Sequence, residues 1–491
     1  MRSRLEKIGN RCYLNERKAI MMFIKRVSIV FCVAILAQSN LKSLIAQPAA
    51  EVPRDPYTAN NRTPDARFKA DILVVVAHPD DETMVTSYLA REIYEQGKRV
   101  AVVYGTRGDG GNNEVGPEQT LAMGQIREIE ARQAVGSLGI SNVWFLSGRD
   151  TPSQNVLNSL EHWGHGRCLD ELVRIVRLTR PTVILTFLPD FTTGENHADH
   201  QAAGVLATEA FDLAGNPAAF SEQVSPVIDP DGNTNFTENL RTWQTEKIYY
   251  FYNPSHDIFS GRGPQYSSSE LSPSQHVSYG MLAAKAFAHH RTQGGDSVQR
   301  AIDSNLLNNS VDEGSWLARQ PVKLIFGKSL VPSATTDDVF AGVVPGGIPF
   351  RRVAVSASVP LSEPAISLGD PWNFYRNFWK EHGLDMADIV PPEVTIKVGG
   401  IFYLPLIIDN PLETPIDVDL SVQAPEGWHV VPTGIATVGP HTRYFLRVQA
   451  QAPPAKLVGW QNFVVAAESN HKSIGEVSVR VELSTGWVAS Q

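Results

Sequence analysis

The most chemically suggestive stretch of the chain is AHPDDE, residues 77–82, which follows five apolar residues. His78 is followed, after one proline, by three consecutive acids, namely Asp80, Asp81 and Glu82. Neighbouring carboxylates repel one another and raise each other's pKa unless a cation or a proton lies between them. Three acids crowded beside one histidine therefore predict a metal site.

A second group of candidate ligands lies about 120 residues later, in the run HADH that ends at His200. It contains His197 and His200, with Asp199 between them. His78, Asp81 and His200 together offer two imidazoles and one carboxylate, a set that suits Zn²⁺ and leaves one position open for water. An open zinc site lowers the pKa of water towards about 7, which makes hydroxide accessible near neutral pH. Fe²⁺ is the alternative metal.

The remaining polar residues of the two runs fit the other roles of a metal-assisted amide hydrolase. Asp80 is the candidate general base that takes a proton from water. His197 would stabilise an oxyanion or protonate the leaving amine, and Asp199 would orient it, as carboxylates commonly orient histidines. Taken alone, AHPDDE is also compatible with an acidic helix N-terminus, and HADH with a solvated loop.

The elements that must position these residues are apolar runs that alternate with amphipathic stretches. The predicted strands are residues 71–79, 99–106, 142–147, 182–189 and 246–253, and the predicted helices include 87–96, 122–138 and 168–178. This alternation predicts βαβ units in a parallel sheet covered by helices on both faces. Active sites of such sheets lie outside the carboxyl ends of the strands, so both polar runs can meet at one edge.

The pattern changes from about residue 390. Six segments between 390 and 486 alternate apolar and polar residues and are separated by Pro, Gly and Asn, which predicts an antiparallel β-sandwich of the immunoglobulin-like class. Residues 303–389 are rich in Pro and Gly without clear periodicity, and we expect a connector that packs on the first domain.

Size, charge and cysteines limit the class of protein. A chain of 491 residues is too long for one ordinary domain. Its net charge of −9 disfavours a nucleic-acid-binding protein, which needs a basic face. If residues 1–46 are removed as a leader, Cys168 is the one cysteine left and no intrachain disulfide can form.

The leader is predicted from a basic pair, Lys25 and Arg26, that precedes the apolar run 27–37. This arrangement is typical of a secretory signal peptide, and Met21 or Met22 is a better start than Met1 because the pair then lies near the terminus. The run is shorter than the roughly 20 residues that span a bilayer, so no permanent membrane span is expected. We therefore expect a secreted or periplasmic protein.

The pair AHPDDE and HADH resembles the PIG-L/LmbE family of zinc-dependent N-acetylglucosamine deacetylases. The resemblance covers roughly residues 66–300, within a predicted domain at 66–302. Further matching runs are TRGDGG after the second strand, RxxEARQA at 127–134, LSGRD ending at Asp150, RPTVILT, and KAFAHHRTQ at 285–293. The last is similar to the family's H-x-S-Q signature, with Thr292 in place of Ser. The resemblance implies a Rossmann-like fold that removes the acetyl group from an N-acetylated sugar.

Carried over residue by residue, the resemblance implies specific roles for seven side chains. The metal ligands are His78, Asp81 and His200, the base is Asp80, the assisting group is His197, and the substrate contacts are Arg127 and Asp150. Ala198 replaces a usual Pro and leaves the ligands in place, whereas Thr151 stands where Gly is common, so the family's sugar-binding details do not carry over at that position. The C-terminal sandwich, with PEGWHVVP at 425–432, resembles the NPCBM-associated modules of secreted carbohydrate-active proteins.

The expected function is removal of the N-acetyl group from an N-acetylglucosamine-containing glycan, glycolipid or glycoconjugate, with possible carbohydrate contact through the sandwich. The alternatives are an amidase on another N-acylated amine and a catalytically inactive secreted carbohydrate-binding protein. We expect no nucleic-acid partner.

Four further groups leave two readings open. Arg127 could contact the substrate or only form a surface ion pair with Glu130. The glycines at 108, 110 and 111 favour a tight turn over a phosphate cradle. His290 could line a pocket or lie on a helix face. His162, His165 and Cys168 lack a fourth ligand, which favours incidental histidines at a helix entrance over a second metal set.

Overall fold

The computed structural model describes residues 64–190, 197–224, 240–252, 259–307, 320–351, 361–384, 391–455 and 459–485. All of the described residues belong to one compact unit, Thr63–Gln491. The predicted leader therefore lies outside the described residues. Within the described ranges, no helix combines the length and the apolar character that a membrane crossing needs.

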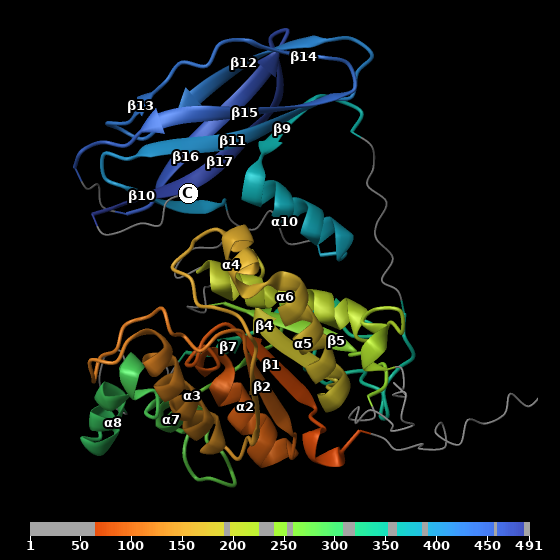
Figure 1. The fold of residues 1–491 in the computed structure, drawn as a ribbon, viewed down its shortest axis with the longest axis vertical. Helices are drawn as coiled ribbons and strands as arrows, with labels where there is room; N and C mark the ends of the chain where they lie inside the picture. Colours follow the sequence, from red (N-terminus) through yellow and green to blue (C-terminus); the bar gives the residue numbers. More distant parts are fainter. Residues whose placement is uncertain are drawn as a thin grey trace, which may run out of the picture. The chain divides into compact units, whose positions relative to one another are not determined.

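The first domain is built on a six-stranded sheet with the order β3-β2-β1-β4-β5-β8 (Figure 1). Its strands are β1 Ile72–Val76, β2 Val100–Tyr104, β3 Asn142–Phe145, β4 Val183–Phe187, β5 Lys247–Phe251 and β8 Ile325–Ser329. The first five are parallel, and β8 pairs antiparallel with β5. The prediction of a mostly parallel α/β sheet is therefore confirmed.

Helices cover both faces of this sheet (Figure 1). Along β1, Ile72, Val74 and Val76 belong to the core that α2 (Thr83–Gln96), α3 (Thr120–Gly136) and α7 (Tyr279–Phe287) complete. Leu73 and Val75 belong to the core with α4 (Val156–Trp163), α5 (His165–Thr179) and α6 (Ala198–Leu213). Because both sides of β1 are buried, the strand is apolar throughout rather than alternating.

Strand β8 lies inside the segment that we expected to be a connector, so the sheet extends beyond residue 302. The sequence of β8, IFGKS, lacks a strand-like pattern for a structural reason. A Cβ at Gly327 would lie 2.6 Å from the ring of Tyr250, so the neighbouring strand excludes any side chain at that position. A glycine at such a close approach weakens the strand signal in the sequence.

The C-terminal domain contains two sheets, ordered β10-β17-β16-β12-β14 and β13-β15-β11-β9. Its strands are β9 Ala365–Leu368, β10 Glu393–Lys397, β11 Ile401–Asn410, β12 Ile416–Gln423, β13 His429–Val430, β14 Ala436–Val438, β15 Thr442–Gln451, β16 Gln461–Ser469 and β17 Lys472–Ser484. Phe402, Trp428 and Phe463 meet edge to face between the sheets, with ring centroids 5.3–6.1 Å apart.

Two details of the sandwich differ from the prediction. Strand β10 pairs parallel with β17, so the sandwich is not entirely antiparallel, and β9 joins its second sheet although it lies before residue 390. With four residues, β9 is too short to show a clear alternation. The other elements within the described residues are the 3₁₀ helices η1 Ala66–Phe68, η2 Ser221–Gln223 and η4 Arg291–Gln293, the strands β6 Gln265–Tyr266 and β7 Val322–Lys323, and the helices α8 Gly295–Asp303 and α10 Asp370–Glu381.

Candidate metal centre

The candidate site lies at the carboxyl ends of strands β1 to β4. The run 78–82 leaves β1, the glycine turn 108–111 follows β2, Asp150 and Thr151 follow β3, and the run 197–200 opens helix α6 after β4. The structure thus brings the two polar runs of the sequence together at one edge of the parallel sheet, as that topology requires.

His78, Asp81 and His200 form one group that could hold a metal ion, because one donor atom from each lies within 4.8 Å of the others. His78 Nδ1 lies 3.4 Å from Asp81 Oδ2, and His200 Nε2 lies 3.1 Å from Asp81 Oδ1. Bonds of about 2.1 Å in tetrahedral geometry separate two zinc ligands by about 3.4 Å. The donor types and their spacing therefore fit zinc.

Local contacts fix two of these three candidate ligands. Asp81 Oδ2 accepts hydrogen bonds from the backbone N–H groups of Ala77 (3.1 Å) and His78 (2.7 Å). The His200 ring stacks on Phe187, at the end of β4, with centroids 4.2 Å apart and planes within 2° of parallel. The turn after β1 therefore orients the carboxylate, and β4 orients the second imidazole.

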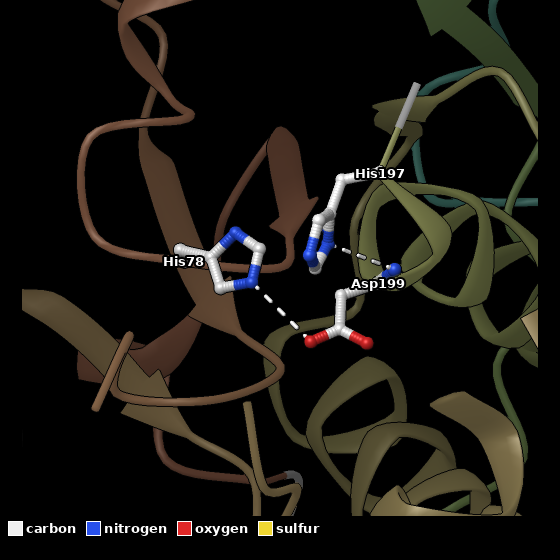
Figure 2. Close-up of side chains that lie close together, drawn as sticks. All are labelled: His78, His197 and Asp199. Carbon is white, nitrogen blue, oxygen red and sulfur yellow. Dashed lines mark hydrogen bonds and ion pairs between the residues drawn. The ribbon is translucent and has the colours of Figure 1, made fainter. Parts of the chain in front are cut away.

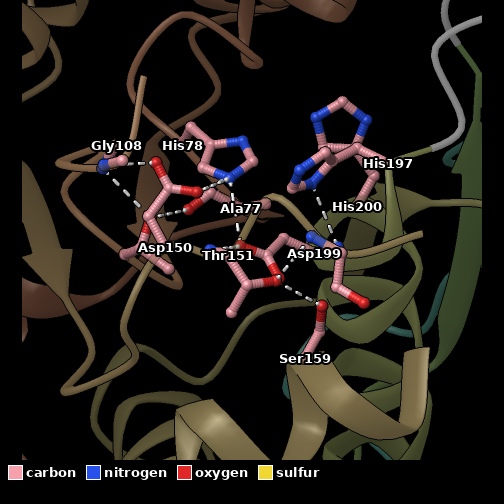
Figure 3. Close-up of polar contacts among 12 residues, drawn as sticks. Ala77, His78, Gly108, Asp150, Thr151, Ser159, His197, Asp199 and His200 are labelled. Carbon is pink, nitrogen blue, oxygen red and sulfur yellow. Dashed lines mark hydrogen bonds and ion pairs between the residues drawn. The ribbon is translucent and has the colours of Figure 1, made fainter. Parts of the chain in front are cut away.

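A second group with metal-binding potential comprises His78, His197 and Asp199 (Figure 2). The carboxylate of Asp199 is fully buried, and its Oδ2 lies 3.4 Å from His78 Nε2. It accepts two hydrogen bonds from Thr151, one from the backbone N–H (2.9 Å) and one from the hydroxyl (3.0 Å) (Figure 3). Asp199 contacts the His197 ring through its backbone N–H, which donates to Nδ1 at 3.3 Å, and not through its carboxylate. Orientation of His197 by the Asp199 carboxylate stays a prediction.

The electrostatics of the site are those of closely opposed charges. Burial alone would lower the pKa of His78, but the carboxylates of Asp150 and Asp81 outweigh it and raise this pKa well above its usual value. Burial alone would raise the pKa of Asp81, but His200 and His78 hold it far below its usual range. Because a histidine must lose its proton to bind a metal, a cation competes with the proton of His78.

The two predicted substrate contacts lie around the glycine turn. Burial opposes ionisation of Asp150, yet His78 at 3.4 Å and the N–H of Gly110 at 2.9 Å lower its pKa to about 2. Arg127 is 5% exposed and donates to the carbonyl of Asn112 at 2.8 Å. A Cβ at Gly108 would lie 2.6 Å from the guanidinium, and Gly108 has a positive φ of 64°. The glycines therefore form a turn that packs against Arg127.

Two more of the open readings are decided by burial and contacts. Glu130 is buried like Arg127 and accepts two hydrogen bonds from Thr292, so the pair is not on the surface. His290 is fully buried and bonds Glu82 at 2.7 Å.

The prediction that His162, His165 and Cys168 are not a second metal set is decided as well. His165 pairs with Glu209 at 2.6 Å, and Cys168 donates to the carbonyl of Trp163 at 3.0 Å. Among the described residues, His162, His165 and Cys168 do not form a metal-binding group.

Sequence reasoning missed the roles of Thr151, Glu82 and Phe187 around the site. Thr151 was notable only as a departure from a common glycine, although its hydroxyl reaches Asp199. Glu82 was counted among the crowded acids, and its pairing with His290 spans 208 positions of sequence. Phe187 looks like any other strand residue. In the sequence, the one indication of the Glu82–His290 pair was His290 within KAFAHHRTQ, and the sequence does not reveal its partner.

Comparisons with known proteins identify relatives of the first domain. The PIG-L family model, described as GlcNAc-PI de-N-acetylase, matches residues 73–211. A 1D-myo-inositol 2-acetamido-2-deoxy-alpha-D-glucopyranoside deacetylase from Streptomyces griseus is 32% identical over 324 residues, which cover 61% of this chain and 97% of that protein. Proteins of the same name from Catenulispora acidiphila and Thermobifida fusca are each 30% identical, over 44% and 30% of this chain.

The alignments span 63% of the Catenulispora protein and 56% of the Thermobifida protein, so the matched part of this chain corresponds to between half and two thirds of each. Among solved structures, an N,N′-diacetylchitobiose deacetylase from Pyrococcus horikoshii is 19% identical, with a TM-score of 0.34, over 55% of this chain and 88% of that chain. A conserved protein from Thermus thermophilus has a TM-score of 0.35 and 20% identity, over 54% of this chain and 97% of that chain.

Proposed function

Because this chain belongs to the PIG-L family, we propose that it is a metal-dependent hydrolase that removes the N-acetyl group from an N-acetylglucosamine-containing glycan, glycolipid or glycoconjugate. The observation that carries the proposal is the convergence of His78, Asp81 and His200 at the carboxyl ends of the parallel strands. The names of the relatives, which are deacetylases of an acetamido sugar joined to inositol, support the substrate class.

Zinc is the metal that we propose for the first group, with Fe²⁺ as the alternative. When bound, the ion supplies a lowered pKa for water and polarises the acetyl carbonyl. His78, Asp81 and His200 would hold it, and the hydrogen bonds on Asp81 and the stacking of Phe187 on His200 pre-orient two of the three donors. Such support of metal ligands is typical of functional sites.

Asp80 is the residue that we propose as general base. Burial, and next the charge of Asp81, raise the pKa of Asp80 well above its usual value. A carboxylate with a raised pKa binds a proton more strongly and is therefore a better proton acceptor from water. Asp80 would therefore take a proton from the attacking water and deliver it to the amine nitrogen as the amide bond breaks.

His197 is better suited to stabilise the oxyanion than to act as an acid. Burial, and next the charge of His78, lower the pKa of His197 to about 4. At pH 7 a group with this pKa is protonated in about one molecule in a thousand. Because Nδ1 accepts the N–H of Asp199, the proton of the neutral ring lies on Nε2, which can donate a hydrogen bond to the developing negative oxygen.

The test is acetate release by the purified zinc-loaded chain from three probes: N-acetylglucosamine, N,N′-diacetylchitobiose and N-acetylglucosaminyl-inositol. We expect release from at least one probe, and we expect Asp80→Asn to reduce kcat by about 10²–10⁴-fold, the usual contribution of a general base. Zinc content of both proteins, measured by elemental analysis, separates loss of the base from loss of the metal. Zinc-loaded protein that releases no acetate from any probe would contradict the proposal and favour another N-acylated amine as substrate.

We also propose that the protein is secreted or periplasmic. The support is the basic pair and apolar run within residues 1–46, and a resemblance of the C-terminal sandwich to modules of secreted carbohydrate-active proteins. Fractionation of cells that express the full chain, with N-terminal sequencing of the product, tests it. A cytosolic product that retains residues 27–37 would contradict it.

A further inference from the structure

Asp80 has an unusual backbone conformation. Its φ is +104°, in a region that residues with a side chain rarely adopt. Such a conformation persists only where the surrounding structure holds it, and it is found preferentially at functional sites. The contacts of the peptide unit that joins Pro79 to Asp80 show what holds Asp80 in this conformation.

Both polar atoms of the Pro79–Asp80 peptide unit are bonded to side chains. The carbonyl of Pro79 accepts a hydrogen bond from Nε2 of Gln293 at 2.7 Å. The N–H of Asp80 donates to Oε2 of Glu82 at 3.1 Å, and the other oxygen of Glu82 lies 2.7 Å from Nε2 of His290. His290 and Gln293 therefore act on the same peptide unit, one directly and the other through Glu82.

The segment that carries His290 and Gln293 is itself anchored. Thr292 donates to the Glu130 carboxylate of α3 through its backbone N–H (3.0 Å) and its hydroxyl (2.6 Å). The carbonyl of Thr292 accepts the N–H of Glu114 at 3.1 Å. His290, Thr292 and Glu130 are all at most 6% exposed, so solvent does not compete for these hydrogen bonds.

We propose that His290, Glu82 and Gln293 are positioning residues. They hold the Pro79–Asp80 peptide unit in the orientation that gives Asp80 its positive φ, and they thereby fix the direction of the Asp80 carboxylate. This inference rests on the proposed function, in which Asp80 is the general base. The neighbouring metal ligand Asp81 is oriented independently, by the N–H groups of Ala77 and His78. We call His290, Glu82 and Gln293 the Asp80 clamp. Removing a hydrogen bond of this clamp should therefore impair proton transfer and leave metal affinity intact.

The first test does not depend on activity. Hydrogen–deuterium exchange in peptides that span residues 77–84 of the full zinc-loaded chain reports the N–H of Asp80. His290→Phe removes the donor to Glu82 while keeping a ring of similar size, His290→Gln retains a donor, and Gln293→Leu removes the bond to Pro79. We expect faster exchange in His290→Phe and Gln293→Leu, and wild-type exchange in His290→Gln.

The matched control is Arg291→Ala, which lies between the two clamp residues. Arg291 is 63% exposed and pairs with Asp296 at the surface, so its removal should change nothing. Unchanged exchange in both His290→Phe and Gln293→Leu would overturn the clamp, whatever the reaction of the protein.

The second test asks whether the clamp acts through Asp80. Because an ångström of misplacement can cost about 10²-fold in rate, we expect His290→Phe to lower kcat by about that factor, with KM and zinc affinity within about twofold of wild type. In an Asp80→Asn background the same substitution should have no further effect, since two changes that act through one group are not additive. His290→Gln should restore most of kcat.

Three results would overturn the assignment: an undiminished kcat in His290→Phe, a parallel loss of zinc affinity, or an equal further loss in the Asp80→Asn background. If His290→Phe does not fold, Gln293→Leu carries the same test, because Gln293 is half-buried and its loss leaves no unpaired charge. Full activity of Asp80→Asn itself would refute the base role, not the clamp, which the exchange experiment judges separately.

Discussion

Thr151→Val should lower both the free energy of unfolding and the affinity for zinc. The substitution removes the hydroxyl that contacts Asp199 without changing side-chain shape. That hydroxyl donates to Oδ1 of Asp199 at 3.0 Å, and the other oxygen of Asp199 lies 3.4 Å from Nε2 of His78. The effect of Thr151 on the metal would therefore be transmitted through Asp199 to the orientation of His78.

The magnitude follows from burial. Thr151 is 3% exposed and Asp199 is 0% exposed, so water does not readily replace the lost donor. A hydrogen bond to a charged group contributes about 1.5–3 kcal/mol, and the backbone N–H of Thr151 remains in place as a second donor. We expect the free energy of unfolding of the metal-free protein to fall by about 1.5–3 kcal/mol. Loss of an outer partner of a metal ligand typically lowers metal affinity by about 10–100-fold.

The assay is denaturant unfolding of the metal-free proteins, combined with zinc titration against a chromophoric chelator. Thr151→Ser keeps the hydroxyl and should retain wild-type zinc affinity. Ser159→Ala removes the other neighbour of the Thr151 hydroxyl, at 3.0 Å, and leaves both bonds to Asp199 intact. Zinc affinity of Thr151→Val equal to that of Thr151→Ser would refute the argument that Asp199 transmits the effect to His78.

Three further predictions follow from the same structure. Phe187→Leu removes the ring stacked on His200 and should weaken zinc binding by about 2–10-fold, the equivalent of an aromatic contact of about 0.5–1.5 kcal/mol; unchanged chelator competition would contradict it. Zinc at 100 times its dissociation constant should stabilise the fold by about 2.7 kcal/mol and raise Tm, whereas an alanine variant of His200 should show little shift. The hydrogen bond to Glu209 raises the pKa of His165, so its stabilisation is present below the unfolded-state pKa of about 6.5 and is lost as pH rises through the folded-state pKa. Because His165 is 40% exposed, His165→Gln should cost at most about 0.5 kcal/mol at pH 5.5 and nothing at pH 9, and a larger cost at pH 9 in urea unfolding would contradict this sign.

The sequence by itself determined the ligand types and the strands that carry them. AHPDDE follows a run of five residues that are buried on both faces of the sheet, and such a run is recognisable without structure. Parallel strands place their carboxyl ends at one edge, so the convergence of His78 with His200 followed from topology alone. The alternating strands of the C-terminal domain were equally visible, because a period of two is a local property of the chain.

Only the tertiary structure decided which partners orient those ligands and where the domains end. Thr151 meets Asp199 across 48 positions, and Glu82 meets His290 across 208, with no periodicity to mark either pair. Strand β8 lies too close to a neighbouring ring, and β9 is too short, to show a pattern, so the sequence did not reveal that the segment 303–389 contributes a strand to each of two sheets. Periodicity and residue type are local properties of the chain, whereas a contact between distant segments depends on how the whole chain packs. That packing also holds Asp80 in a backbone conformation that an aspartate rarely adopts.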